Sequence, residues 1–236
     1  MRRKLDAHEP TETPQTPQPT VVVADTTFWG RHYGICVFRS PALKHNLWWT
    51  EVEKEVMATY HCGRKILEER GWTFTAAVID GRRGLATVFN DIPVQMCHFH
   101  QVQIVRRHLT SRPKTEAGRA LLHIAYTLTY ANEHTFASRL ERWERRWKAY
   151  VTEKTQVLGT THWYYTHKEV RKAYMSIIRN LPYLFTYQKY PKLNIPNTTN
   201  SLDGSFAQLK GKLRAHSGLT KERRYKVISE VLKGEI

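Results

Sequence analysis

Short apolar runs and amphipathic segments alternate along the first half of the chain, and this alternation predicts the elements of an α/β domain. The runs typical of strands are Val21–Ala24, Tyr33–Phe38, TFTAAVID at 73–80 and IPVQMCHF at 92–99. The segments typical of helices are 51–70, GRRGLATVF at 81–89 and the stretch that begins with HQVQIVRRHL at 100–109. We expect the first two strands to be antiparallel and joined through Gly30, and the first helix to end at Gly71. The order of elements over 21–110 therefore predicts a mixed α/β layer structure, with its chemistry at strand ends.

The second half of the chain carries apolar stripes at helical spacing, so we expect residues 115–185 to be nearly all helix. The stripes are Leu121, Ala125 and Leu128; Phe136, Leu140, Trp143, Trp147 and Tyr150; and Val170, Tyr174, Ile177 and Leu181. Because Trp143 and Trp147 share a stripe with Leu140, they are expected in a core rather than as platforms for nucleic-acid bases. A further helix follows a polar, turn-like start and buries Leu202, Phe206, Leu209 and Leu213; a last helix is expected near 221–233.

The charge balance narrows the class of partner. Lys and Arg number 37 against 21 Asp and Glu, a formal net charge of +16. Such a bias favours a polyanion, either nucleic acid or an anionic membrane surface, with a merely basic or ribosome-associated protein as the plain alternative. No basic amphipathic anchor with a clean apolar face stands out, which favours nucleic acid.

Targeting signals and cysteines add little to this picture. No run approaches the roughly 18 apolar residues of a membrane span, and the start of the chain has no apolar core of a signal peptide. Three cysteines without a secretory signal indicate a reducing compartment and no disulfide framework.

Two carboxylates stand at the ends of apolar runs. Asp25 ends VVVAD and Asp80 ends AAVID. If the two strands are neighbours, the carboxylates come together, and a hard cation such as Mg²⁺ or Mn²⁺ would relieve their repulsion. Asp203, early in a helix packed on that sheet, would be a third ligand in front of Lys210 and Arg214 on the same helix face. The plainer alternatives are turn-forming or capping roles for all three acids.

Three motifs, in order over residues 20–233, resemble the DDE-type transposases of the Mutator-like group, which occurs in bacterial insertion sequences and eukaryotic elements. ADTTFWGR resembles the strand of the first acid, and NTTNSLDGSFAQLKGKLRAH resembles the helix of the third. The most specific motif is VIDGRRGLATVFNDIPVQMCHFHQVQIVRRHL, which resembles the second-acid block with its C-x-x-H, here Cys97 and His100. The helical insertion lies between the second and third acids, as in that group.

The resemblance implies a ribonuclease H-like mixed sheet with an all-helical insertion before the third acid. The Pro- and Thr-rich composition of residues 7–20 predicts a disordered tail or linker over 1–20. We then expect 21–112 to be the first part of the core, 113–190 the insertion and 191–236 the helices that complete the core. A linker at the start suggests either a preceding domain or a plain tail. The departure from the family lies at the third acid, where Asp203 stands in place of the usual Glu and is one methylene shorter.

The implied activity is metal-dependent cleavage and strand transfer at the ends of a mobile element. Asp25, Asp80 and Asp203 would be catalytic and would hold two Mg²⁺ or Mn²⁺ ions, which activate water and then the freed 3′ hydroxyl. The implied partners are element ends and target DNA, with a homo-oligomer assembled on DNA and no membrane or small-molecule substrate. The implied location is the bacterial cytoplasm or the eukaryotic nucleus. The alternatives are a truncated remnant that binds DNA without catalysis, and a ribonuclease H-like nuclease with another task.

Two groups of basic residues are candidates for DNA contact. Lys210, Lys212 and Arg214 are expected along backbone phosphates, and Arg142, Arg145 and Arg146 form either a second DNA-contacting face or a solvated one.

The two residues of the C-x-x-H motif, Cys97 and His100, lack an obvious second pair of zinc ligands, with only His61 and Cys62 as possible partners. We therefore favour a structural interpretation, in which Cys97 packs at the strand end and His100 caps or contacts the next helix.

Overall fold

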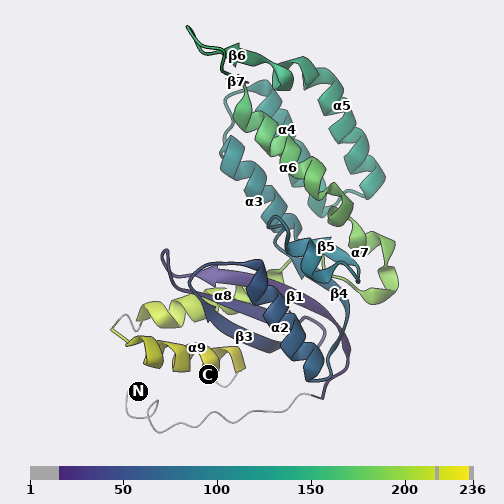
Figure 1. The fold of residues 1–236 in the computed structure, drawn as a ribbon. Helices are drawn as coiled ribbons and strands as arrows, with labels where there is room; N and C mark the ends of the chain where they lie inside the picture. Colours follow the sequence, from purple (N-terminus) through teal and green to yellow (C-terminus); the bar gives the residue numbers. More distant parts are fainter. Residues whose placement is uncertain (1–15, 216–217, 234–236) are drawn as a thin grey trace. The chain divides into compact units, whose positions relative to one another are not determined.

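The chain folds into two compact units in the computed structural model, which describes residues 16–215 and 218–233. The sheet unit consists of residues 1–93 together with 199–236, and the helical unit consists of residues 94–198 (Figure 1). The helical unit is thus an insertion in the sequence of the sheet unit. None of the helices in the described ranges is both long and apolar enough to cross a membrane.

A mixed five-stranded sheet has the order β3-β2-β1-β4-β5. Its strands are β1 (Pro19–Phe28), β2 (Gly34–Ser40), β3 (His45–Val52), β4 (Thr73–Ile79) and β5 (Val94–Met96). β1 is antiparallel to β2, which is antiparallel to β3, whereas β1 and β4 are parallel, with Val23 opposite Val78. The α/β class and the mixed sheet predicted from the sequence are confirmed.

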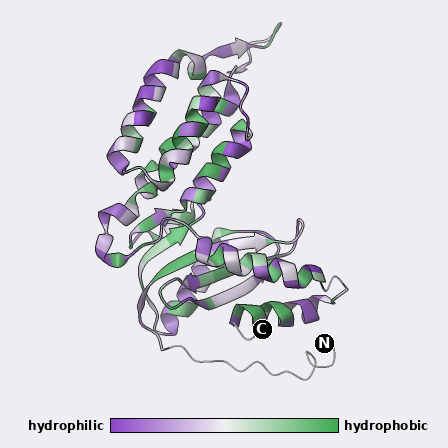
Figure 2. Cartoon of the chain, turned by 180° about the vertical axis from the view of Figure 1, so that it is seen from behind, coloured by the Kyte–Doolittle hydropathy of each residue, from purple (hydrophilic) through white to green (hydrophobic). Residues whose placement is uncertain are grey.

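The strands at the centre of the sheet are buried, which explains why they are continuous apolar runs rather than alternating ones. Val22, Val23 and Ala24 of β1 are fully buried, as are Ala76 and Ala77 of β4. In Figure 2 these strands are coloured as hydrophobic, while the helices carry mixed hydrophobic and hydrophilic positions. The apolar runs that predicted the first and third strands are therefore the core of the sheet unit.

Helices of the sheet unit cover both faces of its sheet. On one face α2 (Met57–Glu69) lies so close to β3 that a Cβ on Gly63 would stand 2.5 Å from the Trp48 ring. Side chains alternate along a strand, so Trp49 points to the opposite face, where its Nε1 donates to Ser229 Oγ of α9 (Lys221–Lys233) at 3.4 Å. The edge strand β3 is therefore held from both sides.

Helix α8 (Asn200–Ala215) packs against β1 and begins with the polar segment noted in the sequence. Its buried residues are Leu202, Phe206, Leu209 and Leu213, the four that the apolar stripe predicted. The last helix, predicted at 221–233, is α9 with the same bounds. Both predictions are confirmed.

The helical unit has a hydrophobic core of its own, whose buried members all lie between Met96 and Phe185. Its helices are α3 (His98–Leu109), α4 (Glu116–Tyr126), η2 (Thr127–Thr129), α5 (Glu133–Thr152), α6 (Lys168–Leu184), α7 (Thr186–Lys189) and η3 (Pro191–Leu193). Trp143 is buried in this core, stacks on Tyr174 at 5.1 Å and donates from Nε1 to Ala117 O at 3.0 Å. Trp147 is partly buried against the same core, so the predicted packing role of the tryptophans is confirmed.

Four secondary-structure predictions were wrong in part. The strand expected at 92–99 is only β5, since His98 and Phe99 already belong to α3. Residues 51–52 belong to β3 rather than to the first helix, which begins only at Met57 after the extended backbone of Val56. The strand β3 gave no periodic signal because six of its eight residues are only half-buried at the sheet edge. Residues 115–185 are not all helix, since β6 (Lys154–Gln156) and β7 (Trp163–Tyr165) form a hairpin too short to show a period of two. Residues 81–89 contain only the 3-10 turn η1 (Leu85–Phe89).

The unit boundaries also differ from the predicted ones. We expected the insertion at 113–190, whereas the helical unit runs from 94 to 198. The reason is that α3 packs not only on its neighbour α4 but also on α6, which is far from it in sequence, and no local pattern reports that long-range contact. Of the predicted tail, residues 1–15 lie outside the described residues, while Pro19 and Thr20 belong to β1 and pair with Thr73 and Phe74.

Candidate active site at the ends of β1 and β4

Asp25 and Asp80 stand at the same level of two neighbouring parallel strands. Val23 of β1 is opposite Val78 of β4, and each acid follows its valine by two residues. Asp25 is 5% exposed, whereas Asp80 is partly exposed directly after β4. Asp80 directly follows β4, whereas Asp25 lies inside β1, which continues beside β2 as far as Phe28, so the predicted strand-end position is observed for Asp80 and not for Asp25.

Backbone donors orient both carboxylates. Thr26 N donates to Asp25 Oδ1 at 2.8 Å. Arg82 N donates to Asp80 Oδ1 at 2.9 Å, the two-residue turn that Asp forms readily. Gly81 in this turn has a φ of 77°, a left-handed conformation that a residue with a Cβ adopts only with strain. The glycine therefore lets the chain reverse directly behind the acid.

A third acid, Glu55, links β1 to the turn after β4 through a chain of hydrogen bonds. The Tyr60 hydroxyl donates to Glu55 Oε1 at 2.7 Å and is 2.9 Å from the hydroxyl of Thr26, the neighbour of Asp25. On its other side Glu55 Oε2 accepts from Arg82 Nη1 at 2.8 Å, and Arg82 is the residue whose amide holds Asp80. The segment before α2 thus connects the turn after β4 to β1.

The electrostatics of this region are those of an acidic site. Burial and then the negative charge of Asp80 raise the pKa of Glu55, although Tyr60 and Arg82 act in the opposite direction. Burial raises the pKa of the Cys36 thiol to about 12, and the charges of Glu55 and Asp25 add to that effect. Nearby negative charges that penalise further ionisation attract a cation, which would relieve the repulsion.

Asp203 lies in the first turn of α8, as the sequence predicted, and is partly exposed. Its amide donates to Thr199 O at 3.1 Å, and its Oδ2 accepts from Thr199 Oγ1 at 3.4 Å. A carboxylate in the first turn is also favoured by the helix dipole. The helix packs on β1, the strand of Asp25, so Asp203 belongs to the same unit as the other two acids.

The acids do not assemble into a complete metal site. Among residues 16–215 and 218–233 no group of three or more His, Cys, Asp or Glu side chains is arranged to hold a metal ion. Asp25 and Asp80 are nevertheless hard oxygen donors at the same level of β1 and β4, whereas Glu55 is already bonded to Tyr60 and Arg82. Asp25 and Asp80 are therefore the residues best suited to take part in holding a cation.

The C-x-x-H motif lies at the start of α3 in the helical unit. Cys97 is buried at the N-cap, and its carbonyl accepts from Gln101 N at 3.1 Å. His100 follows in the first turn, with its ring 5.8 Å from that of Phe99. This arrangement agrees with the structural interpretation of the motif. The buried histidine of the segment is His98, whose Nε2 donates to Leu184 O at 2.6 Å and whose pKa is lowered by burial.

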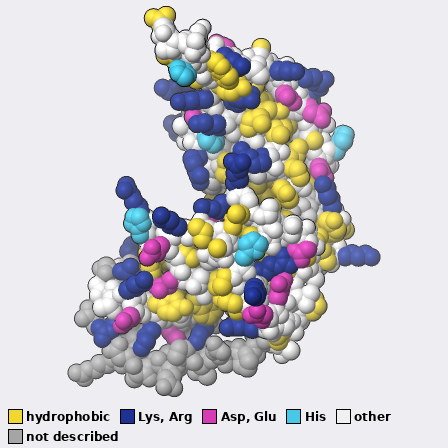
Figure 3. Space-filling model, in the orientation of Figure 1, with side chains coloured by type: hydrophobic (Ala, Val, Ile, Leu, Met, Phe, Trp, Pro, Cys, Tyr) yellow, Lys and Arg dark blue, Asp and Glu magenta, His cyan; other side chains and the backbone are white. Residues whose placement is uncertain are grey.

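The predicted DNA-contacting residues lie on two helices in different units. Lys210, Lys212 and Arg214 are in the second half of α8, and the three arginines are on α5. On α5 the charges are mixed: Arg146 pairs with Glu116 at 2.6 Å and Arg142 bonds the carbonyl of Ser138. In the helical unit the Lys and Arg side chains visible in Figure 3 gather on the side that carries α3 and the start of α6.

Sequence reasoning missed Glu55, Tyr60 and Arg82. Tyr60 lies in the first helix, where its aromatic ring fits the pattern of buried apolar positions. The hydrogen bond from its hydroxyl to Glu55 forms only in the folded chain, so the sequence gives no sign of it. Arg82 is part of the D-G-R-R turn, where its position two residues after Asp80 was the one available signal. Glu55 gave none, because its neighbours in sequence do not show that it faces a sheet.

Comparison of the chain with models of protein families, with curated proteins and with solved structures found no match. The resemblance to Mutator-like transposases therefore stays a prediction from the three sequence motifs.

Proposed function

We propose that the chain is the catalytic core of a DDE-type transposase of the Mutator-like group, which cuts DNA at the ends of a mobile element and joins the freed 3′ ends to target DNA. The observation that carries the proposal is the register of β1 and β4, with Asp25 and Asp80 two residues beyond the pair Val23 and Val78. The mixed sheet, with antiparallel β2 and β3 beside it, is compatible with a ribonuclease H-like fold, which is part of the proposal.

The donor chemistry of the site suits Mg²⁺ or Mn²⁺. Mg²⁺ is commonly held by one or two carboxylates, with water and substrate phosphates completing its shell, so Asp25 and Asp80 suffice as the protein's share. Asp203 is the proposed third ligand. Two such ions, when bound, supply Lewis-acid polarisation of the phosphodiester and stabilise the attacking and leaving oxygens.

The chain's own residues fix the position of these carboxylates. Asp25 is buried and held by the amide of Thr26, so its orientation changes little on binding. Asp80 is held by the amide of Arg82, whose guanidinium is in turn bonded to Glu55. Glu55 is a positioning residue in this scheme, since it bonds the groups that hold the ligands rather than facing the DNA.

DNA is the proposed partner, and the net charge of +16 supports it. Lys210, Lys212 and Arg214 on α8 follow Asp203 along one helix, which would set backbone phosphates beside the cut. Pairing two element ends requires more than one copy, so the proposal includes a homo-oligomer on DNA.

A second candidate function is a remnant that binds DNA without catalysis. The observation that favours it is the missing group of three acids in the part of the chain that the structure describes. The shorter side chain of Asp203 at the third position points the same way, because Mg²⁺ tolerates misplaced ligands poorly.

Nicking of supercoiled plasmid by the purified chain tests both. We expect nicking with Mg²⁺ or Mn²⁺ and none with EDTA. Asp25→Asn and Asp80→Asn should each lose at least about 100-fold, since a metal ligand matters more than the groups that hydrogen-bond to it, whose loss has effects of about 10–100-fold. Both variants should still bind DNA, because the charge that binds phosphates is unchanged.

The matched control is Glu69→Gln, which removes an exposed acid of α2 and should nick like the wild type. Asp203→Ala decides whether the third acid takes part. Nicking that survives in both Asn variants would point to a contaminating nuclease and refute the active site. A wild-type chain that binds DNA but never nicks it would establish the remnant instead.

A further inference from the structure

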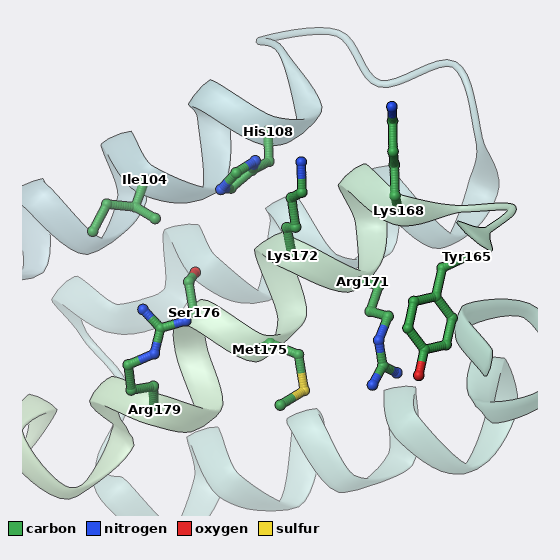
Figure 4. Close-up of a pocket in the computed structure, with 9 residues that line it drawn as sticks. All are labelled: Ile104, His108, Tyr165, Lys168, Arg171, Lys172, Met175, Ser176 and Arg179. Carbon is green, nitrogen blue, oxygen red and sulfur yellow. The ribbon is translucent and has the colours of Figure 1, made fainter. Parts of the chain in front are cut away.

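A stripe of cations runs along α6 in the helical unit. Arg171 and Lys172 follow Lys168 by three and four residues, and Arg179 follows Lys172 by seven. The four cations therefore share one helix face about 16 Å long. With His108 and Ile104 of α3 and Tyr165 of β7 they line a pocket of about 320 Å³ (Figure 4).

The stripe carries an unusual excess of positive charge. Helix α6 contains four Lys or Arg and a single acid, Glu169, and α3 beside it adds two arginines and no acid. Glu169 is engaged by His108 and Lys172, each at 2.9 Å, whereas no carboxylate among the described residues pairs with Lys168 or Arg179. By contrast, α5 interleaves its five cations with three glutamates. The α6 stripe is therefore the stronger anion site of the two.

Aromatic rings continue from the pocket onto the β6–β7 hairpin and alternate there with cations. The Arg171 guanidinium lies 4.0 Å from the centre of the Tyr165 ring. Lys154 Nζ lies 5.9 Å from the same ring and 3.8 Å from that of Trp163. Trp163 is 52% exposed, so an indole with a cation on one side remains available to a partner.

Packing within the protein does not explain why these rings and cations alternate at the surface. Contacts between a cation and an exposed ring add little to folding stability, and a two-stranded hairpin alone is marginally stable. A hairpin shaped for stability alone would bury Trp163 and the residue at its turn, yet Leu158 is 99% exposed. The combination of cations that can hold phosphates and rings that can hold bases is typical of proteins that bind single-stranded nucleic acid.

We propose that the α6 stripe and the β6–β7 hairpin form a binding site for single-stranded DNA. Backbone phosphates lie along Lys168, Arg171 and Arg179, while unpaired bases stack on Trp163 and enter the pocket beside Tyr165. A duplex would use the cations but leave the rings without a partner, because its bases are stacked inside the helix. The site lies apart in sequence from the carboxylates; only the choice of DNA over RNA rests on the proposed function.

Fluorescence anisotropy of the full chain in EDTA tests this proposal without cleavage. The probes are an oligo-dT of about 16 nucleotides, within the range one small domain covers, and a duplex of equal length. Lys168→Glu/Arg179→Glu should weaken oligo-dT binding at least about 10-fold and flatten its salt dependence, because fewer counterions are released. Trp163→Ala should weaken oligo-dT binding about 5- to 150-fold, the loss of one base stack, and leave duplex binding unchanged.

The control for charge is Lys65→Glu/Arg70→Glu, which changes the net charge by the same amount on exposed positions of the sheet unit. Circular dichroism melts of all variants separate a binding loss from unfolding. Unchanged oligo-dT affinity in Trp163→Ala, an equal loss in the control, or tighter binding of an oligo-U of the same length would each overturn the proposal. Because the assay needs no metal, Asp25→Asn should bind normally, so a failure here and a failure of the nicking assay are told apart.

Discussion

A single carboxyl group, that of Glu55, connects β1 to the turn after β4, the two segments that carry Asp25 and Asp80. Through Tyr60 it reaches the hydroxyl beside Asp25, and through Arg82 it reaches the turn of Asp80. Burial of an acid next to another acid costs free energy, and the raised pKa of Glu55 is the sign of that cost. Sites that hold functional groups in place are where such costs are expected.

The pH dependence of stability should report on Glu55. Its pKa is higher in the folded chain than the ordinary value of 4.5, so the folded state holds this proton more tightly than the unfolded chain. The contribution of Glu55 to stability is thus fully present below that value and is lost as the pH rises through the raised pKa. Relative to Glu55→Gln, the wild type should lose stability as the pH rises from 4.5 toward neutrality.

Urea unfolding midpoints of the two chains over that pH range are the measurement. Taking the difference between the chains removes the titration of every group that does not interact with Glu55. The control variant is Glu69→Gln, which removes an exposed acid of α2. A constant difference between wild type and Glu55→Gln at all pH values would mean that the carboxyl is not perturbed.

At this scale the sequence predicted the acids but not what holds them. Asp25 and Asp80 follow apolar runs, and a charge at such a position is a local signal. The partners of Glu55 are Tyr60, five residues later, and Arg82 in a separate segment, and a hydrogen bond between distant segments has no periodicity to detect. The three-acid metal group stays a prediction, because whether Asp203 reaches the other two depends on how α8 lies on β1.

Among the elements, α2 and α8 show opposite uses of glycine. Gly63 of α2 lets the helix approach β3 until a Cβ would stand 2.5 Å from the Trp48 ring. Gly211 of α8 is exposed, and a Cβ there would meet nothing within 4 Å. The first glycine permits close packing, whereas the second only adds backbone freedom to the unfolded chain.

Alanine at the two positions should therefore have effects of opposite sign. Gly63→Ala should destabilise the chain by about 1–2 kcal/mol, the cost of overpacking less the gain in helix propensity. Gly211→Ala should stabilise it by about 0.5–1 kcal/mol. Urea unfolding followed by circular dichroism measures both, and each variant serves as the control for the other. Stabilisation by Gly63→Ala would show that the ring of Trp48 moves aside without cost.

Elements with one buried stripe were the most predictable. The stripe of α8 gave its four buried residues, because a helix packed on one side leaves a period near 3.6 in the sequence. The strand β3 and the β6–β7 hairpin left no such trace, being respectively half-buried at an edge and only three residues per strand. The basic stripe of α6 was overlooked for a related reason: its cations share the helix with an apolar stripe that dominated the pattern.

As a whole, the molecule is one unit inserted into the sequence of another. The buried members of the helical core all lie between residues 96 and 185, so that core needs no residue of the sheet unit. The insertion was predictable from the change in periodicity near 115. Its boundaries were not, since the membership of α3 is decided by its packing on α4 and α6.

A chain of residues 94–198 expressed alone should therefore fold. We expect a helical circular dichroism spectrum and a cooperative thermal transition, because the hydrophobic core is contained in this segment. Phe136→Ala should remove about 3–5 kcal/mol by opening a cavity in that core, and thus abolish the transition or lower it strongly. A gradual melt without a transition in the unmodified segment would show that the helical unit depends on the rest of the chain.

The split of the sheet unit has a consequence for synthesis on the ribosome. The strands with Asp25 and Asp80 emerge first, but the face of the sheet that Trp49 shares with α9 stays open until the last 38 residues, 199–236, follow the whole insertion. For the time taken to translate 105 residues, the nascent sheet exposes apolar surface that invites chaperones or aggregation. A premature stop codon anywhere in the insertion would make that exposure permanent, so truncated products should be cleared rather than accumulate beside the intact protein.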